Sequence, residues 1–281
     1  MKYAYYPGCT LENTAQEYNQ SVLEVGHKLG IEMNEISNWT CCGASSGHFT
    51  DYWVSHALSA RNLALAERQG MDIAVACPAC YLRLNDTRHE FLNEAKFRER
   101  LPSLINLSYR AKYEVKHILE IFSNSLSIEA ARAKITNSLN GLKLVSYYGC
   151  YLVRPPELTH FDDPENPQTM DCLLQTLGAE VFDWRAKVDC CGGSLSFTNR
   201  NTVVRLTSDI IAAASEVEAE AIVTACPLCQ ANLETRQSKG PAIPVLYFTE
   251  LLGLAIGCNS TPWFKRHMIS PVNLLAKHGL E

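Results

Sequence analysis

Short apolar runs alternate with longer amphipathic stretches along this chain, and this alternation predicts strands followed by helices. In the first half, the strands are expected at 2–6, 31–36 and 73–76, and the helices at 14–29 and 52–69. Val22, Val25 and Leu29 follow the three- and four-residue spacing of a helix face, and Gly30 ends that helix. Strands that alternate with helices are typical of an α/β fold.

The second half repeats the same order of elements. Here the strands are expected at 142–148, 179–184 and 221–225, and the helices at 169–177 and 203–214. Between the halves, the apolar stretch 115–122 (VKHILEIF) is expected to be helical, and a further helix is expected at 128–139. The stretch 245–252 (VLYFTELL) parallels 115–122, which extends the repeat.

Cysteines set the register of this repeat. Cys41 and Cys190 are 149 residues apart, and the same spacing separates the first and the last cysteines of the two CxxC motifs, 77–80 and 226–229. Only the leading cysteines, Cys9 and Cys150, are 141 apart. The eight extra residues of the second half are assigned to a loop insertion in the polar, proline-bearing segment 155–168.

An internal duplication therefore defines the predicted fold class. We expect an α/β protein with two pseudo-symmetric modules, each a small sheet with flanking helices. The expected organisation is a first module at 1–95, a helical linker at 96–141, a second module at 142–257 and a C-terminal tail at 258–281.

Composition and charge narrow the possible classes. The 281 residues are 47% hydrophobic and 20% charged, which is ordinary for a globular protein. No apolar run approaches the roughly 18 residues of a membrane-spanning helix, and the N-terminus shows no signal-peptide core, so we expect a cytoplasmic protein without a membrane span. A net charge of −5 without a basic run argues against a nucleic-acid partner.

Ten of the twelve cysteines fall into two sets of five thiols. Disulfides are disfavoured without an export signal, and five is an odd number for pairing. A zinc site takes four ligands and would leave one thiol over in each set. Five thiolates suit a multi-iron centre better, so an iron–sulfur site is favoured, with zinc or redox dithiols as alternatives. The thiols are expected at the carboxyl ends of strands and at helix starts, where backbone amides favour thiolates.

The spacing Cys-x31-Cys-Cys-x34-CxxC, followed by Cys-x39-Cys-Cys-x34-CxxC, resembles the twin cysteine-rich CCG domain of the B subunit of heterodisulfide reductase. The resemblance covers nearly the whole chain. It implies two noncubane [4Fe-4S] clusters, one held by each module. The implied ligands of the first are Cys9, Cys41, Cys42, Cys77 and Cys80, and those of the second are Cys150, Cys190, Cys191, Cys226 and Cys229.

The resemblance also implies a function. Proteins of this family reduce a disulfide between their two clusters; in methanogenesis the substrate is the coenzyme M–coenzyme B heterodisulfide, and a related small-molecule disulfide is equally compatible. The sequence has no ferredoxin-type cysteine run, dinucleotide fingerprint or P-loop, so electrons must come from partners.

The resemblance implies which partners these are. One is a small ferredoxin-like protein with two cubane clusters, the C-type component of such complexes. Another is a flavin-containing protein, the A-type component, which bifurcates electrons. A hydrogenase or formate dehydrogenase can join them. The alternative to this enzyme is a noncatalytic electron relay in a quinone-linked dehydrogenase complex.

Several other residues are weaker candidates. His48, His117 and Tyr148 are considered as proton donors because of their sequence positions, although packing or solvent exposure explains each more simply. Cys172 and Cys258 lie outside the repeat and are expected to be buried structural thiols. The run 265–267 (KRH) could bind an anionic substrate, but a surface patch or partner contact is the simpler interpretation. The acidic loop 162–165 is interpreted as a solvated insertion rather than a metal site.

Overall fold

Two four-stranded sheets organise the computed structural model, which describes residues 1–44, 47–196, 198–237 and 242–280. The strand orders are β2-β1-β3-β4 and β6-β5-β7-β8, and all neighbouring strands are parallel. The equal order in both halves confirms the predicted α/β duplication. The strands are β1 (Lys2–Tyr6), β2 (Glu32–Glu35), β3 (Ile73–Val75), β4 (Val115–His117), β5 (Lys143–Tyr147), β6 (Glu180–Val181), β7 (Ala221–Thr224) and β8 (Val245–Tyr247).

Helices connect the strands and cover both sheets. The central strands β3 and β7 are buried along their whole length, as parallel strands between helical layers must be. The helices of the first half are α1 (Gly8–Asn13), α2 (Gln16–Lys28), α3 (Gly47–Thr50), α4 (Tyr52–Glu67), α5 (Pro78–Asn93), α6 (Ala95–Ile105), α7 (Ile118–Ser123) and α8 (Ser125–Arg132). Those of the second half are α9 (Pro156–Thr159), α10 (Thr169–Thr176), the 3-10 helix η1 (Gly193–Leu195), α11 (Arg200–Glu216), α12 (Pro227–Thr235), α13 (Phe248–Ala255), α14 (Thr261–Phe264) and α15 (Val272–Lys277).

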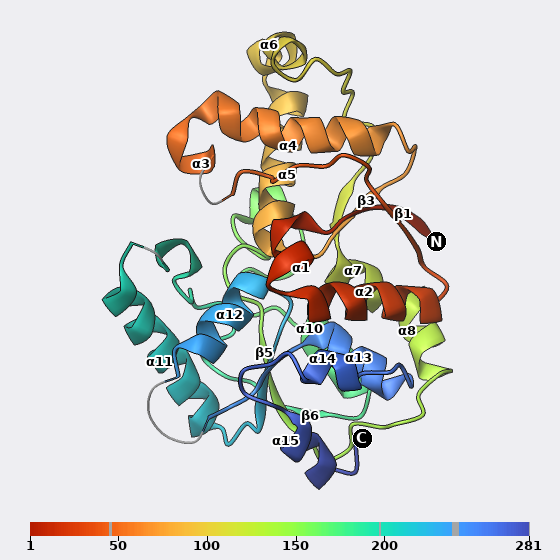
Figure 1. Cartoon of the computed structure of the whole chain (residues 1–281), viewed down its shortest axis with the longest axis vertical. Coiled ribbons are helices and arrows are strands. Elements are labelled where there is room, and N and C mark those ends of the chain that lie inside the picture. The colour runs from red at the N-terminus through yellow and green to blue at the C-terminus, as the bar shows by residue number, and fades with distance from the viewer. Residues whose placement is uncertain (45–46, 197, 238–241, 281) are drawn as a thin grey trace.

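The two halves interlock through reciprocal helix packing. Helix α2, which follows the first strand of one sheet, packs against α13, which follows the fourth strand of the other sheet, and α10 packs against α7 in the same way. Figure 1 shows α2, in red, beside the blue α13 and α14. The hydroxyl groups of Ser21 and Thr249 lie 2.6 Å apart in this interface. One apolar core cluster therefore spans both halves, and a second cluster lies within the second half.

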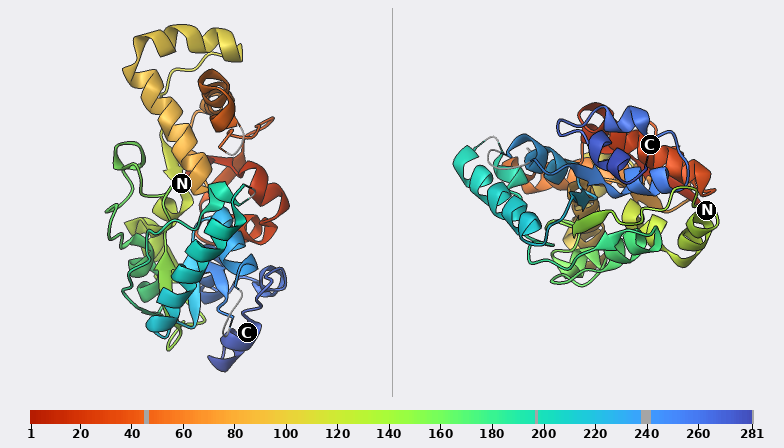
Figure 2. Two further views of the ribbon diagram at one scale, coloured as in Figure 1. Left: turned by 90° about the vertical axis from the view of Figure 1, so that its left-hand side faces the viewer. Right: turned by 90° about the horizontal axis from the view of Figure 1, so that it is seen from below.

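The insertion at 155–168 crosses from the second half to the first. It contains α9, which packs against α5, and the Tyr81 hydroxyl donates to Thr159 O. In Figures 1 and 2, α6 lies at the end of the long axis opposite α15. None of the described helices is both long and apolar enough to cross a bilayer. The module limits predicted from the sequence stay a prediction.

Three local expectations need correction. The stretch 115–122 is not wholly helical: β4 pairs with β3 before α7 begins, and 245–252 likewise divides into β8 and α13. The helix expected at 128–139 ends at Arg132, because the backbone amides of Thr136 and Asn137 instead donate to Ala255 O at the end of α13. Cys9 lies inside the short helix α1, which the sequence pattern did not predict.

Candidate metal centres

The two CxxC motifs open helices directly after the central strands. Cys77 and Cys226 are the N-cap residues of α5 and α12, and a proline follows each at the first helical position, where it has no intrahelical hydrogen bond to lose. The first turn closes when the amides of Tyr81 and Gln230 donate to the carbonyl oxygens of Cys77 and Cys226. Both sulfurs of each motif are therefore held within one turn at the carboxyl edge of a sheet.

In the first set, the remaining cysteines approach this helix start from two other elements. The Cys42 and Cys80 sulfurs lie 3.2 Å apart, and those of Cys9 and Cys41 lie 4.0 Å apart. The amide of Gly43 donates to the Cys41 sulfur over 3.4 Å. Five thiols from three segments of the chain thus meet at one place, as the sequence predicted.

The second set has the same arrangement. The Cys191 and Cys229 sulfurs are 3.5 Å apart, and the Gly192 amide donates to the Cys190 sulfur over 3.3 Å. Asn232 adds a side-chain contact of 3.7 Å from its amide nitrogen to the Cys191 sulfur. The duplication therefore preserves the contacts between thiols as well as their spacing in the sequence.

Buried and solvent-exposed cysteines occupy corresponding positions in the two sets. The second cysteine of the adjacent pair and both cysteines of the CxxC motif are buried, whereas the leading cysteine and the first of the pair reach solvent. The solvent-facing members are Cys9 and Cys41 in the first set and Cys150 and Cys190 in the second. Each site is thus anchored inside the protein and open on one side.

Hydrogen bonds between thiols separate the pKa values within each set. The neighbouring Cys42 and Cys9 thiols lower the pKa of Cys41, and the Cys150 thiol lowers the pKa of Cys190. The partner thiolates and burial raise the pKa of other members, such as Cys80 and Cys229. Hydrogen bonds from Cys80 and Cys229 likewise lower the pKa of Cys77 and Cys191, so each set holds two thiols whose thiolate form, the form that ligates metal, is favoured.

Two glycines leave room for the sulfurs. Gly8 and Gly149 have φ angles of 75° and 66°, and a Cβ there would lie 3.2 Å from the Cys80 sulfur and 3.0 Å from the Cys229 sulfur. Five soft donors around such a cradle fit a polynuclear iron–sulfur group. Over the described part of the chain, no three His, Cys, Asp or Glu side chains are arranged to hold a single metal ion.

Two cavities adjoin the second set. A small one of about 30 Å³ lies among its thiols, and Pro78 of the first CxxC motif forms part of its wall. A larger one of about 600 Å³ reaches Cys150 between the halves of the molecule. The first half lines it with His48, Leu82 and Arg83, and the second half with Cys150, Tyr151, Arg154, Pro155, Pro156, Pro164 and Glu165. The insertion that distinguishes the second module thus forms one wall.

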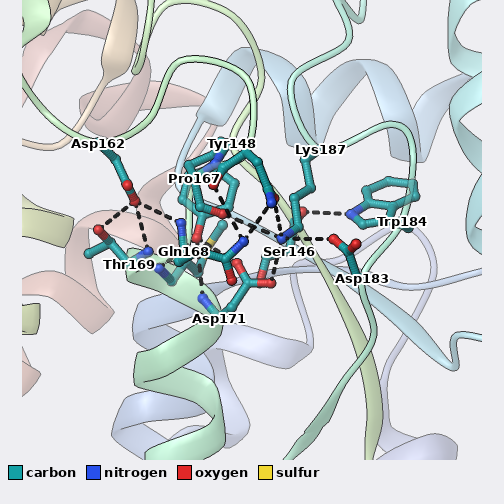
Figure 3. A network of polar contacts seen from close by, with 12 residues as sticks. Ser146, Tyr148, Asp162, Pro167, Gln168, Thr169, Asp171, Asp183, Trp184 and Lys187 are labelled. Atoms are coloured by element: carbon teal, nitrogen blue, oxygen red, sulfur yellow. Dashed lines mark hydrogen bonds and ion pairs between the residues drawn. The ribbon is translucent and has the colours of Figure 1, made fainter.

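A buried ion pair links the segments of the chain that carry Cys150 and Cys190 (Figure 3). The Lys187 ammonium lies 3.2 Å from Asp171 Oδ1, and the two side chains are only 4% and 5% exposed. Asp171 also accepts a hydrogen bond of 2.6 Å from the Tyr148 hydroxyl. The carbonyl oxygen of Lys187 accepts from the amides of Tyr148 and Gly149. The segment that carries Cys150 is therefore tied to the segment before Cys190.

The three candidate proton donors have different surroundings. His48 lines the larger cavity, with its Nδ1 3.0 Å from the Arg83 guanidinium. His117 is fully buried: one ring nitrogen contacts Ala76 O, the other caps α7, and burial lowers its pKa to about 3. Tyr148 is buried and its hydroxyl is engaged by Asp171. Of the three, His48 alone lines the larger cavity, where burial and the Arg83 guanidinium lower its pKa. His117 and Tyr148 make structural contacts.

Two expectations outside the motifs were wrong. Cys172 is exposed rather than buried, and Cys258 is only partly buried. His267 does not belong to a surface patch: it is buried between the Glu234 and Glu250 carboxylates, 2.9 Å from each, because the C-terminal tail folds back onto α12 and α13.

The other two side chains of the run 265–267, and the acidic loop, lie at the surface or in turns. Lys265 is exposed, and Arg266 pairs with Glu17 at 2.9 Å. In the acidic loop, Asp162 accepts from the Gln168 and Thr169 amides before α10, and Asp163 accepts from two amides of its own turn. Both carboxylates therefore accept backbone hydrogen bonds within or beside the insertion.

Sequence reasoning missed Lys187, Asp171 and Arg83. Asp171 gave a faint signal, since it shares the buried face of α10 with Met170 and Leu174. The first module has no equivalent of this ion pair: Asn38 stands where Lys187 would be, and Pro7 where Tyr148 would be. The two sites are therefore alike in their thiols and different in their surroundings.

Comparison with known proteins gives matches that follow the duplication. The family described as CCG, cysteine-rich domain, matches residues 3–85 and 144–234. The 8-methylmenaquinol:fumarate reductase membrane anchor subunit of Wolinella succinogenes is 33% identical over 91% of this chain and 92% of its own length. The B subunit of the ferredoxin/F420H2-dependent CoB-CoM heterodisulfide reductase of Methanosarcina acetivorans is 28% identical over 98% of this chain and 96% of its own.

Among solved structures, a hypothetical protein from Helicobacter pylori has a TM-score of 0.75 over 95% of this chain, at 12% identity. The chain spans 51% of that protein's length. At this identity the likeness shows the fold alone.

Proposed function

The chain belongs to the family of proteins with the cysteine-rich CCG domain, and we propose that it is the disulfide-reducing iron–sulfur subunit of an oxidoreductase complex. Each thiol set would hold one noncubane [4Fe-4S] cluster through its five cysteines. When bound, the clusters would supply one electron each to the disulfide, and two protons complete its conversion to two thiols. The coenzyme M–coenzyme B heterodisulfide and related small-molecule disulfides are the proposed substrates.

One observation carries this proposal: the cavity of about 600 Å³ at Cys150 is lined from both halves of the molecule. The first CxxC motif also reaches the second site, through Pro78. A small molecule bound there would contact both modules at once, next to a sulfur that faces solvent. The amides of Gly43 and Gly192 stabilise negative charge on the ligand sulfurs. His48 lines the cavity wall, where burial and the Arg83 guanidinium lower its pKa and so disfavour its protonated form.

Partner proteins complete the proposal. The ferredoxin-like protein with two cubane clusters and the flavin-containing protein would deliver electrons, with a hydrogenase or formate dehydrogenase as their source. Relatives such as the heterodisulfide reductase component of M. acetivorans support an assembly of this kind. Methanogenic metabolism, electron bifurcation and a cytoplasmic location stay predictions.

A reoxidation assay tests the function. The purified protein, loaded with iron and sulfide and reduced chemically, is mixed with a panel of small-molecule disulfides while thiol release is measured. We expect two thiols per disulfide in the wild type and none in Cys42→Ala or Cys191→Ala. Zinc in place of iron and sulfide in the purified protein would refute the cluster assignment.

A second candidate function is supported by one observation. The relative from W. succinogenes belongs to a quinol-linked reductase, so an electron relay between a partner and a quinone is the alternative. The same assay distinguishes the two, because a relay would be reoxidised by a quinone analogue and would release no thiol from a disulfide.

A further inference from the structure

One hydroxyl group contacts both CxxC loops. The Tyr18 hydroxyl lies 2.9 Å from Ala225 O and 3.2 Å from Ala76 O. These alanines directly precede Cys226 and Cys77, the first cysteines of the two motifs. A phenol has a single proton, so it is shared between the two carbonyl oxygens in a three-centre hydrogen bond.

The surroundings hold the Tyr18 ring in place. The ring is fully buried and stacks on Tyr247, with 4.1 Å between the centroids and 4° between the planes. Tyr18 belongs to α2 of the first half, whereas Tyr247 ends β8 of the second half. The phenol therefore stands between the two sites and is fixed from both halves.

The two halves differ in the side chain that contacts the alanine carbonyl oxygen before each CxxC motif. In the first half, His117 Nε2 lies 2.9 Å from Ala76 O. Tyr247 occupies the corresponding position of the second half, but within the described residues its buried hydroxyl has no hydrogen-bond partner. Tyr18, from the other half, contacts Ala225 O in its place. In the second half, a hydrogen bond from Tyr18 of the first half thus takes the place of the local contact that His117 makes in the first half.

We propose that Tyr18 is a positioning residue that fixes the spacing between the two cluster sites. Displacement of the second CxxC loop relative to the first would break the hydrogen bond to Ala225 O and leave that buried carbonyl oxygen without its side-chain donor, whereas Ala76 O would keep its contact with His117. Its role in cluster spacing rests on the proposed function, whereas the link between the two loops does not require iron.

Tyr18→Phe removes the hydroxyl and keeps the stacked ring. Two controls match it: Tyr247→Phe removes a neighbouring hydroxyl that has no partner among the described residues, and Tyr5→Phe removes a buried hydroxyl that bonds Asn19 within the first half. In the protein as purified, with or without iron, Tyr18→Phe should speed amide hydrogen exchange about tenfold at residues 221–231 and less at 73–82, where His117 still bonds Ala76 O. Tyr247→Phe should change neither segment, and Tyr5→Phe should leave 221–231 unchanged.

Iron-loaded protein gives a second readout. We expect Tyr18→Phe to retain the iron of both sites but to alter the magnetic coupling between them, seen as a changed line width in the electron paramagnetic resonance spectrum. Unchanged exchange at 221–231 would overturn the proposed link between the loops. Altered exchange with unchanged coupling would overturn its role in cluster spacing, and neither result depends on whether disulfides are reduced.

Discussion

Gly149 lies so close to Cys229 that a Cβ on the glycine would be 3.0 Å from the cysteine sulfur. Its φ angle of 66° is also one that residues with side chains rarely adopt. The corresponding pair in the first half, Gly8 and Cys80, has the same relationship at 3.2 Å. The space for the cluster is therefore built from the backbone on one side and from the thiols on the other.

Gly149→Ala should consequently empty the second site. We expect about half of the iron and acid-labile sulfide to be lost, because the first site is untouched. Gly30→Ala is the control: Gly30 has a φ of 73°, but a Cβ there meets nothing within 4 Å. Equal iron loss in both variants would show that backbone strain, and not the contact with the sulfur, is responsible.

Cys191→Ala tests whether the two sites assemble independently. Each set draws its five thiols from one half of the chain, so this variant should lose the second cluster and retain the first. Cys42→Ala should do the reverse. Iron and sulfide analysis together with Mössbauer spectroscopy checks both variants, and loss of both clusters from either one would contradict independent assembly.

Lys187→Met should destabilise the protein by about 3–5 kcal/mol, because it leaves the buried Asp171 carboxylate without its ammonium partner. Urea unfolding measures this change. Arg185→Gln, two residues earlier, removes an exposed ion pair with Glu216 and should have no measurable effect. An equal loss of unfolding free energy in both variants would contradict the larger stabilisation assigned to the buried pair.

The ion pairs of buried His267 should make the free energy of unfolding depend on pH. Burial disfavours its charged form, but the Glu250 and Glu234 carboxylates outweigh burial and raise the pKa of His267 to about 10. A raised pKa means that this contribution to stability is complete below the ordinary histidine value of about 6.5 and is lost as the pH rises through about 10. The difference in unfolding free energy between wild type and His267→Gln should therefore shrink over that range. A constant difference would contradict a charged His267.

The apolar runs and the cysteine register were sufficient to predict the duplication, the order of most strands along the chain and the meeting of five thiols in each half. They could not predict the strands at 115–117 and 245–247, since three residues that lead straight into a helix show no strand alternation. Lysine is almost always exposed, so nothing marked Lys187 as buried.

Tyr18 could not be found for a different reason. Its partners are backbone carbonyl oxygens at residues 58 and 207 positions away, and such contacts leave no side-chain pattern in the sequence. The reciprocal packing of α2 with α13 and of α10 with α7 creates them. Long-range geometry between repeats therefore had to come from the structure.

The most direct test of the central claim is electron paramagnetic resonance of the oxidised, iron-loaded protein after addition of a thiol labelled with a magnetic sulfur isotope. If each site captures one sulfur of the disulfide, a new signal broadened by the labelled sulfur should appear in the wild type and in both variants that keep a single cluster. A spectrum that the thiol leaves unchanged, in a protein whose clusters still exchange electrons with a quinone analogue, would contradict disulfide reduction and favour the relay.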